Sequence, residues 1–295
     1  MSQLHDDKLK FLEEKANDIR RSIIRSLQAA GSGHTGGPLG MADVFTALYF
    51  HILKHDPANP DWEQRDRLVL SNGHICPVQY AAMAHAGYFP VEELQTLRKY
   101  GSRLQGHPHR NMLPGIEVSS GPLGTGLPQA VGMAIGLKMN KQPNQIYCLM
   151  GDGEQDCGII WEAVMLAGKL KLDNLTGLID RNNIQIDGMT EDIMPLEPLR
   201  EKYESFGWHV IDANGHDFQD INNAFEMARA IYEKPVLIIA HTIPGKGVPE
   251  IEFDYRWHGV PPGAGPEDKF AKADQVAEML SRLRTLDGKI RSEHQ

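Results

Sequence analysis

A Gly-Asp-Gly element at Gly151-Asp152-Gly153 and an asparagine further along the chain, Asn182, are residue types that suit a metal–diphosphate site. The apolar runs 146–150 and 175–179, which precede them, are typical of buried strands. Parallel strands joined by a helix bring both elements to one carboxyl edge of a sheet, where glycines let backbone approach a ligand. Carboxylate, amide and carbonyl oxygens are ligands for Mg²⁺. The pattern therefore predicts a metal-bridged diphosphate.

Five histidines lie in or beside segments that contain glycine or proline: His34, His74, His107, His109 and His258. A lone histidine is more often a surface or core group, but imidazoles in such loops can donate to phosphate oxygens or exchange protons near neutral pH. Zinc is disfavoured, because the two closely spaced histidines at 107 and 109 have no cysteine or histidine partners at the usual spacing.

The segment 31–36 matches the dinucleotide pattern GxGxxG. A predicted helix precedes it instead of a strand, so the context of a nicotinamide site is missing. The simpler alternative is a glycine loop shaped for close packing.

Composition narrows the class of protein. Thirty Lys and Arg against 39 Asp and Glu give a net charge of −9, which argues against nucleic acid as a partner. No apolar run is long enough for a membrane span, and the polar stretch 1–10 does not resemble a secretory signal. Three cysteines without metal-type spacing suit a reducing compartment, so we expect a cytoplasmic protein.

Strand and helix patterns alternate along most of the chain, which predicts an α/β fold with a mostly parallel sheet flanked by helices. A Pro- and Gly-rich loop at 244–266 and a last helix at 267–286 should follow. The patterns predict helices at 11–27, 41–54, 129–138, 158–170, 196–206 and 217–233, and strands at 68–70, 146–150, 175–180, 208–213 and 236–240.

In order and spacing, seven stretches resemble the N-terminal half of the transketolase family, and most of all the separate N-terminal subunit of split-gene transketolases. The resemblance implies a thiamine-diphosphate-binding fold, with 1–295 as a single diphosphate-binding domain. The stretches are Ala30-Gly31-Ser32-Gly33-His34, Leu70-Ser71-Asn72-Gly73-His74, Gly106-His107-Pro108, Gly121-Pro122-Leu123-Gly124, Gly151-Asp152-Gly153-Glu154, Ile184-Gln185-Ile186-Asp187-Gly188 and Trp257-His258-Gly259.

The resemblance also implies roles for single residues, which we carry over by position. Asp152, Asn182 and the carbonyl of Ile184 would hold Mg²⁺, or alternatively Ca²⁺ or Mn²⁺. The other implied contacts are Gly153, His74 and His258 with the diphosphate of thiamine diphosphate, Gly121 and Leu123 with its aminopyrimidine, Ile186 with its hydrophobic middle, and His34, His107 and His258 with the hydroxyls of the donor sugar.

Such a subunit would transfer a two-carbon ketol unit between sugar phosphates, as in the pentose phosphate pathway. The activating glutamate and the phosphate-binding arginines belong to the pyrimidine-binding and C-terminal domains in this family. The resemblance therefore implies a separate C-terminal subunit, in an α2β2 assembly, without which this chain would be inactive.

One departure concerns Cys157, where the family usually has a glutamate, with Asp156 one position early. The alternatives are half of another thiamine enzyme, either 1-deoxyxylulose-5-phosphate synthase-like or 2-oxo acid dehydrogenase α-like, and a non-catalytic thiamine-binding paralogue.

Overall fold

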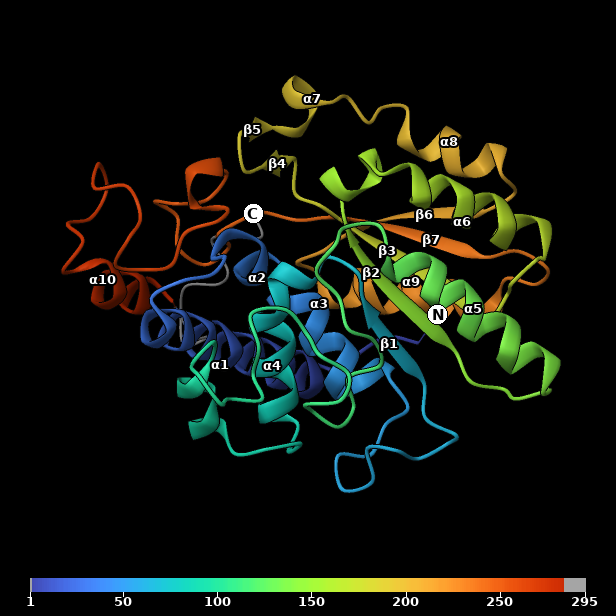
Figure 1. Ribbon diagram of the computed structural model, residues 1–295, viewed down its shortest axis with the longest axis horizontal. Coiled ribbons are helices and arrows are strands. Elements are labelled where there is room, and N and C mark those ends of the chain that lie inside the picture. The colour runs from blue at the N-terminus through green and yellow to red at the C-terminus, as the bar shows by residue number, and fades with distance from the viewer. Residues whose placement is uncertain (1, 284–295) are drawn as a thin grey trace.

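The computed structural model describes residues 2–283. A parallel five-stranded sheet with the order β1-β2-β3-β7-β6 crosses its centre (Figure 1). The predicted α/β class with a mainly parallel sheet is confirmed. The strands of this sheet are β1 (Arg67–Leu70), β2 (Ile146–Gly151), β3 (Leu175–Arg181), β6 (His209–Asn214) and β7 (Val236–His241).

Helices cover both faces of the sheet, because successive side chains of each strand point to opposite faces. In β2, Tyr147 and Leu149 pack into one core, and Ile146, Cys148 and Met150 pack into the other. The first core is closed by α1 (Asp6–Ala30), α3 (Ala42–Ala47), α4 (Cys76–His85) and α9 (Phe218–Ala230), and the second by α5 (Gly126–Met139), α6 (Gly158–Lys169) and α8 (Leu199–Ser205).

The unit β2–α6–β3 brings the two elements of the predicted site together. Gly151, the last residue of β2, lies opposite Asp180 in the parallel register of β3. Asp152 and Asn182 therefore leave neighbouring strands at the same carboxyl edge, as the sequence predicts.

Beyond β3 the chain forms a small antiparallel hairpin, β4 (Ile184–Gln185) and β5 (Gly188–Met189), followed by α7 (Thr190–Ile193). Figure 1 shows these elements standing clear of the main sheet. The helix predicted at 196–206 begins later, at Leu199. The helix predicted at 217–233 is α9, which starts after Asp217 because that carboxylate caps the Gln219 and Asp220 N–H groups.

The structure differs from the sequence-based expectation in two segments near the N-terminus. The glycine-rich stretch after α1 contains a short helix, α2 (Gly36–Gly40). The helix predicted at 41–54 is α3 followed by a π-helical turn at Leu48–Ile52. None of the helices in residues 2–283 combines the length and apolar character needed to cross a bilayer.

The last helix predicted at 267–286 is wrong over its first half. It begins only at Gln275 and ends at Arg282 as α10, and 284–286 lie outside the described residues. In the segment before it, the Gln275 side-chain amide donates to the carbonyls of Gly265, Pro266 and Phe270, and these hydrogen bonds hold the chain in turns instead of a helix.

Gln275 is fully buried and also accepts the N–H groups of Gly263 and Gly265. The turn held in this way lies directly on the indole of Trp257, so close that a Cβ at Gly265 would come within 2.2 Å of it. Trp257 precedes His258 in the loop 244–266, where the only helical turn is Tyr255–Trp257. Gln275 thus supports the segment that carries His258.

We expect Gln275→Leu to lower the free energy of unfolding by about 3 kcal/mol, because it leaves buried backbone groups without partners. Urea denaturation measures this change. Gln129→Leu is the matched control: Gln129 is exposed on α5 with one side-chain hydrogen bond, and its loss should change stability by less than about 0.5 kcal/mol. Equal effects of both substitutions would contradict this role of Gln275.

Candidate functional site

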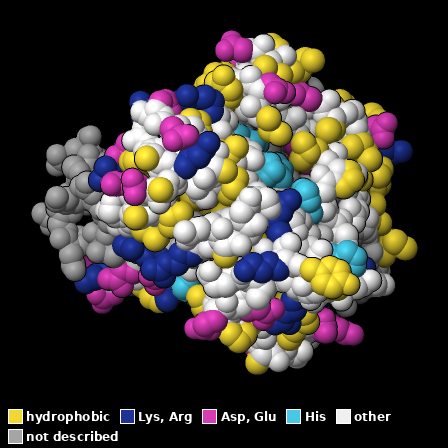
Figure 2. Space-filling model, turned by 60° about the vertical axis from the view of Figure 1, so that its left-hand side comes forward, with side chains coloured by type: hydrophobic (Ala, Val, Ile, Leu, Met, Phe, Trp, Pro, Cys, Tyr) yellow, Lys and Arg dark blue, Asp and Glu magenta, His cyan; other side chains and the backbone are white. Residues whose placement is uncertain are grey.

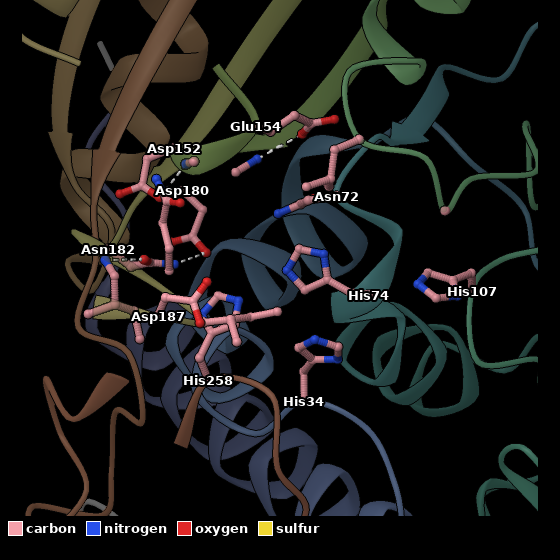
Figure 3. A pocket seen from close by; sticks show the side chains of 17 residues that line it. His34, Asn72, His74, His107, Asp152, Glu154, Asp180, Asn182, Asp187 and His258 are labelled. Atoms are coloured by element: carbon pink, nitrogen blue, oxygen red, sulfur yellow. Dashed lines mark hydrogen bonds between the residues drawn. The ribbon is translucent and has the colours of Figure 1, made fainter. Parts of the chain in front are cut away.

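A cavity of about 340 Å³ opens at the carboxyl edge of the sheet. Every residue to which the sequence assigned a site role lines it, although those roles stay predictions. Figure 3 shows Asp152, Asp180 and Asn182 on one side of it and His34, His74 and His107 on the other. The assigned residues are His34, His74, His107, Gly121, Leu123, Asp152, Gly153, Asn182, Ile184, Ile186 and His258.

The Asp152 carboxylate is buried and held in one orientation. Its Oδ2 accepts from the Arg181 guanidinium at 3.2 Å, the Asn183 N–H at 2.8 Å and the Thr190 hydroxyl at 3.2 Å. Its Oδ1 accepts only from the Gly153 N–H, at 2.7 Å. Burial raises the pKa of Asp152, and the Arg181 charge opposes that shift. Oδ1 is therefore the oxygen that keeps a lone pair for a ligand.

The amide of Asn182 is oriented by its neighbours on both sides. Its Nδ2 donates to Asp180 Oδ2 at 2.8 Å, and its Oδ1 accepts from the Ile184 N–H at 3.0 Å. Asp180 in turn accepts from the Thr242 hydroxyl, and burial raises its pKa to about 7. The amide oxygen consequently faces the same space as Asp152.

Three imidazoles form the opposite wall. The ring centroids of His34 and His74 are 4.7 Å apart, and those of His34 and His258 are 5.6 Å apart. Burial lowers the pKa of His34 and of His258 to about 4, with the charge of His258 adding to the shift of His34. These rings are neutral at pH 7, so each offers one donor and one acceptor.

Several buried polar atoms in and beside the cavity have no hydrogen-bond partner among the described residues 2–283. They include Nδ1 of His34 and of His258, and Oδ1 of Asn72. Because unpaired buried polar atoms are costly, these atoms need water or a polar ligand as a partner. Figure 2 shows histidines at the base of a hollow on the surface.

The cavity also has lining residues that sequence reasoning left without a role: Asn72, Glu154, Asp180, Gln185 and Asp187. Four of them lie within the stretches that carry the family resemblance, and Asp180 ends the strand predicted at 175–180, so position in the sequence was the available signal. His109 is exposed instead, and it does not line the cavity.

Apolar and small side chains lie at the rim. Leu123 and Ile186 are exposed by 41% and 63%. Cys157 is half-buried, and the exposed Asp156 accepts a 3.3 Å hydrogen bond from Gln185.

The donor chemistry fits a hard divalent cation bound together with a phosphate group. Asp152 Oδ1 and Asn182 Oδ1 are oxygen donors on one wall, and the backbone of Ile184 adjoins them. No cluster of three or more His, Cys, Asp or Glu side chains suited to a metal occurs in residues 2–283. A cation here would need amide, carbonyl and ligand oxygens to complete its shell.

We expect His258→Asn to change how stability depends on pH. The folded pKa of about 4 lies below the unfolded value of about 6.5, so the unfolded state binds more protons between these values. The free energy of unfolding of the wild type falls as the pH drops through that window. The variant has no imidazole at position 258, so it lacks the part of this fall that His258 causes. Between pH 8 and pH 5, the variant should gain about 2 kcal/mol relative to wild type. Denaturation curves at both pH values measure the difference; parallel losses would contradict it.

Comparison with known proteins identifies the family of the chain. The family description "Transketolase, thiamine diphosphate binding domain" matches residues 12–275. A 6-deoxy-6-sulfo-D-fructose transketolase subunit of Clostridium sp. (strain MSTE9) is 48% identical over 80% of this chain and 86% of its own length. One of the subunits of an apulose-4-phosphate transketolase from Phocaeicola vulgatus is 41% identical over 92% of this chain and 96% of its own length.

Longer relatives match over less than half of their length. Transketolase 1 of Escherichia coli is 42% identical over 85% of this chain but 40% of its own. The crystal structure of transketolase from Campylobacter jejuni superposes with a TM-score of 0.81 at 38% identity, over 92% of this chain and 45% of that one. With the family match covering most of its length, the chain belongs to the transketolase family, as its thiamine-diphosphate-binding domain.

Proposed function

We propose that this chain is the cofactor-binding subunit of a two-subunit transferase that moves a two-carbon ketol unit from a ketose to an aldose. The observation that carries the proposal is the cavity lined by Asp152, Asn182 and three half-buried imidazoles. When bound, thiamine diphosphate supplies the carbon nucleophile and the electron sink for this chemistry.

At the sheet edge, Asp152, Asn182 and the carbonyl of Ile184 would hold Mg²⁺, with Ca²⁺ or Mn²⁺ as alternatives. The fixed hydrogen bonds of the Asp152 Oδ2 support this assignment, because they leave Oδ1 facing the cavity. Gly153, His74 and His258 would contact the diphosphate. A Cβ at residue 153 would come within 2.9 Å of the Gln185 side chain, so glycine suits the crowded position.

The remaining cofactor contacts would come from the rim. Gly121 and Leu123 would lie against the aminopyrimidine, and Ile186 against the hydrophobic middle of the cofactor. The high exposure of Leu123 and Ile186 supports this, because exposed apolar side chains at a cavity mouth gain from a ligand that covers them.

His34, His107 and His258 would face the hydroxyls of the sugar. The pKa of each is lowered, by burial first, so the neutral rings can accept a proton from a hydroxyl or donate one to it. Substrates would be sugar phosphates. The names of the two similar subunits give different substrates, so they do not identify the sugar that this chain would use.

A partner subunit would supply the other domains, in an α2β2 assembly. The lengths of the unsplit relatives support the existence of a partner subunit, since this chain spans about 40% of them. Three exposed apolar side chains on one face of α6 and at its end, which we call the α6 strip, offer a surface for it: Ile159, Leu166 and Leu170, each exposed by 39–42%. The three free cysteines suit the cytoplasm as the location.

We expect ketol transfer only when this chain is mixed with its partner subunit, because neither chain would hold the whole cofactor. The measurement is transfer from a ketose phosphate to an aldose phosphate by each chain alone and by the mixture, with thiamine diphosphate and Mg²⁺. Transfer by this chain alone would contradict the two-subunit proposal, and no transfer by the purified complex with any sugar phosphate would contradict the activity.

In the reconstituted complex, Asp152→Asn should weaken Mg²⁺-dependent binding of thiamine diphosphate by roughly 100-fold or more. An amide at this position must turn its NH₂ either to the cation or to the donors around Oδ2. Calorimetry measures the affinity. Asp212→Asn is the control, since Asp212 pairs with Arg200 and His241 outside the cavity. Unchanged affinity in Asp152→Asn would refute the metal assignment.

A further inference from the structure

Glu154 is a buried carboxylate on the cavity wall to which neither the sequence nor the family resemblance gives a role. It is 2% exposed. Its Oε1 accepts from the Ser71 hydroxyl and from the Gly124 N–H, both at 2.5 Å, and its Oε2 accepts from the Gly151 N–H at 3.0 Å. It forms no ion pair with any of the described residues 2–283. Figure 3 shows Glu154 beside Asn72, at one rim of the cavity.

The three donors come from three segments that meet at the sheet edge. Ser71 follows β1, Gly151 ends β2, and Gly124 belongs to the loop 121–126 that leads into α5. The Ser71 hydroxyl oxygen also accepts from the Gly126 N–H at 3.0 Å. The loop is therefore attached to the two strand ends at two points, Gly124 and Gly126, and Glu154 is the acceptor common to all three segments.

The loop is also tightly packed at the point of attachment. Gly124 has φ +84°, and a Cβ there would come within 2.8 Å of Cys157 and of Ile159, at the start of α6. A loop that loses its hydrogen bond to Glu154 cannot settle closer to α6. It can only move outward, and Gly121 and Leu123, which line the cavity, would move with it.

We propose that Glu154 is a positioning residue that fixes the separation between two walls of the cavity: the Asp152–Gly153 wall and the Gly121–Leu123 wall. This inference rests on the proposed function, in which thiamine diphosphate spans both walls. The diphosphate end meets the first wall and the aminopyrimidine the second. An outward shift of the loop would remove contacts with the aminopyrimidine ring of the cofactor. It would leave the contacts with the diphosphate unchanged.

The predicted signature is a selective loss of affinity. Glu154→Gln nearly preserves the shape but replaces one acceptor atom by an NH₂ donor. Whichever way the amide turns, this NH₂ faces a backbone N–H, that of Gly124 or that of Gly151. In the complex with the partner subunit, thiamine diphosphate with Mg²⁺ should bind about tenfold more weakly, while inorganic diphosphate with Mg²⁺ should change by less than about twofold.

Calorimetry with both ligands measures the two affinities, and steady-state kinetics give a second readout. The KM for thiamine diphosphate should rise while kcat at saturating cofactor stays near the wild-type value. Ser71→Ala removes the hydroxyl that links Gly126 to Glu154, so it should cause the same selective loss to a smaller extent. It decides the question if Glu154→Gln fails to fold.

Glu117→Gln is the matched control, because Glu117 is another buried carboxylate, paired with Arg65 outside the cavity. It should lower the melting temperature and leave both affinities unchanged. Equal weakening of both ligands, or of neither, in Glu154→Gln and Ser71→Ala would overturn the positioning role. A wild-type complex that binds no thiamine diphosphate would overturn the proposed function instead.

Discussion

The geometry of the cavity depends on the way in which one buried carboxylate is held. Three donors, among them the Arg181 guanidinium, converge on Asp152 Oδ2. Arg181 also pairs with Glu191 and Glu197, which follow the β4–β5 hairpin. The carboxylate that follows β2 is thereby joined to the segment after β3. A buried charge of this kind is tolerated only when it is paired and hydrogen-bonded, so the two segments are fixed together.

Three other buried polar side chains each form hydrogen bonds with more than one segment of the chain. Asp180 orients the Asn182 amide and binds the Thr242 hydroxyl after β7. Glu154 joins the ends of β1 and β2 to the loop before α5, and Gln275 holds the turn under Trp257. Each is nearly or fully buried, and each links segments that local structure alone would leave independent. The hydrogen-bonding atoms left unpaired around the cavity lie on the histidines and Asn72.

The sequence predicted the parallel sheet and the positions of its strands well, because short apolar runs bounded by polar residues carry a strong local signal. It also identified a set of residues that the structure brings to one cavity, since the carboxyl ends of parallel strands meet. The start of α10 was missed, because the carbonyls before it bind the Gln275 side chain, a contact that apolar periodicity does not reveal. The role of Glu154 was missed for a similar reason: its partners lie at Ser71 and Gly124, far from it in the chain.

The α6 strip has a consequence for how a cell would have to make this protein. A helix face with three large exposed apolar side chains favours self-association whenever this chain is made in excess of the partner that covers that face. If both subunits were made in equal amounts and bound each other quickly, few copies of this chain would remain without a partner. In the proposed two-subunit enzyme, the exposure of this helix face would therefore depend on the relative expression of the two genes.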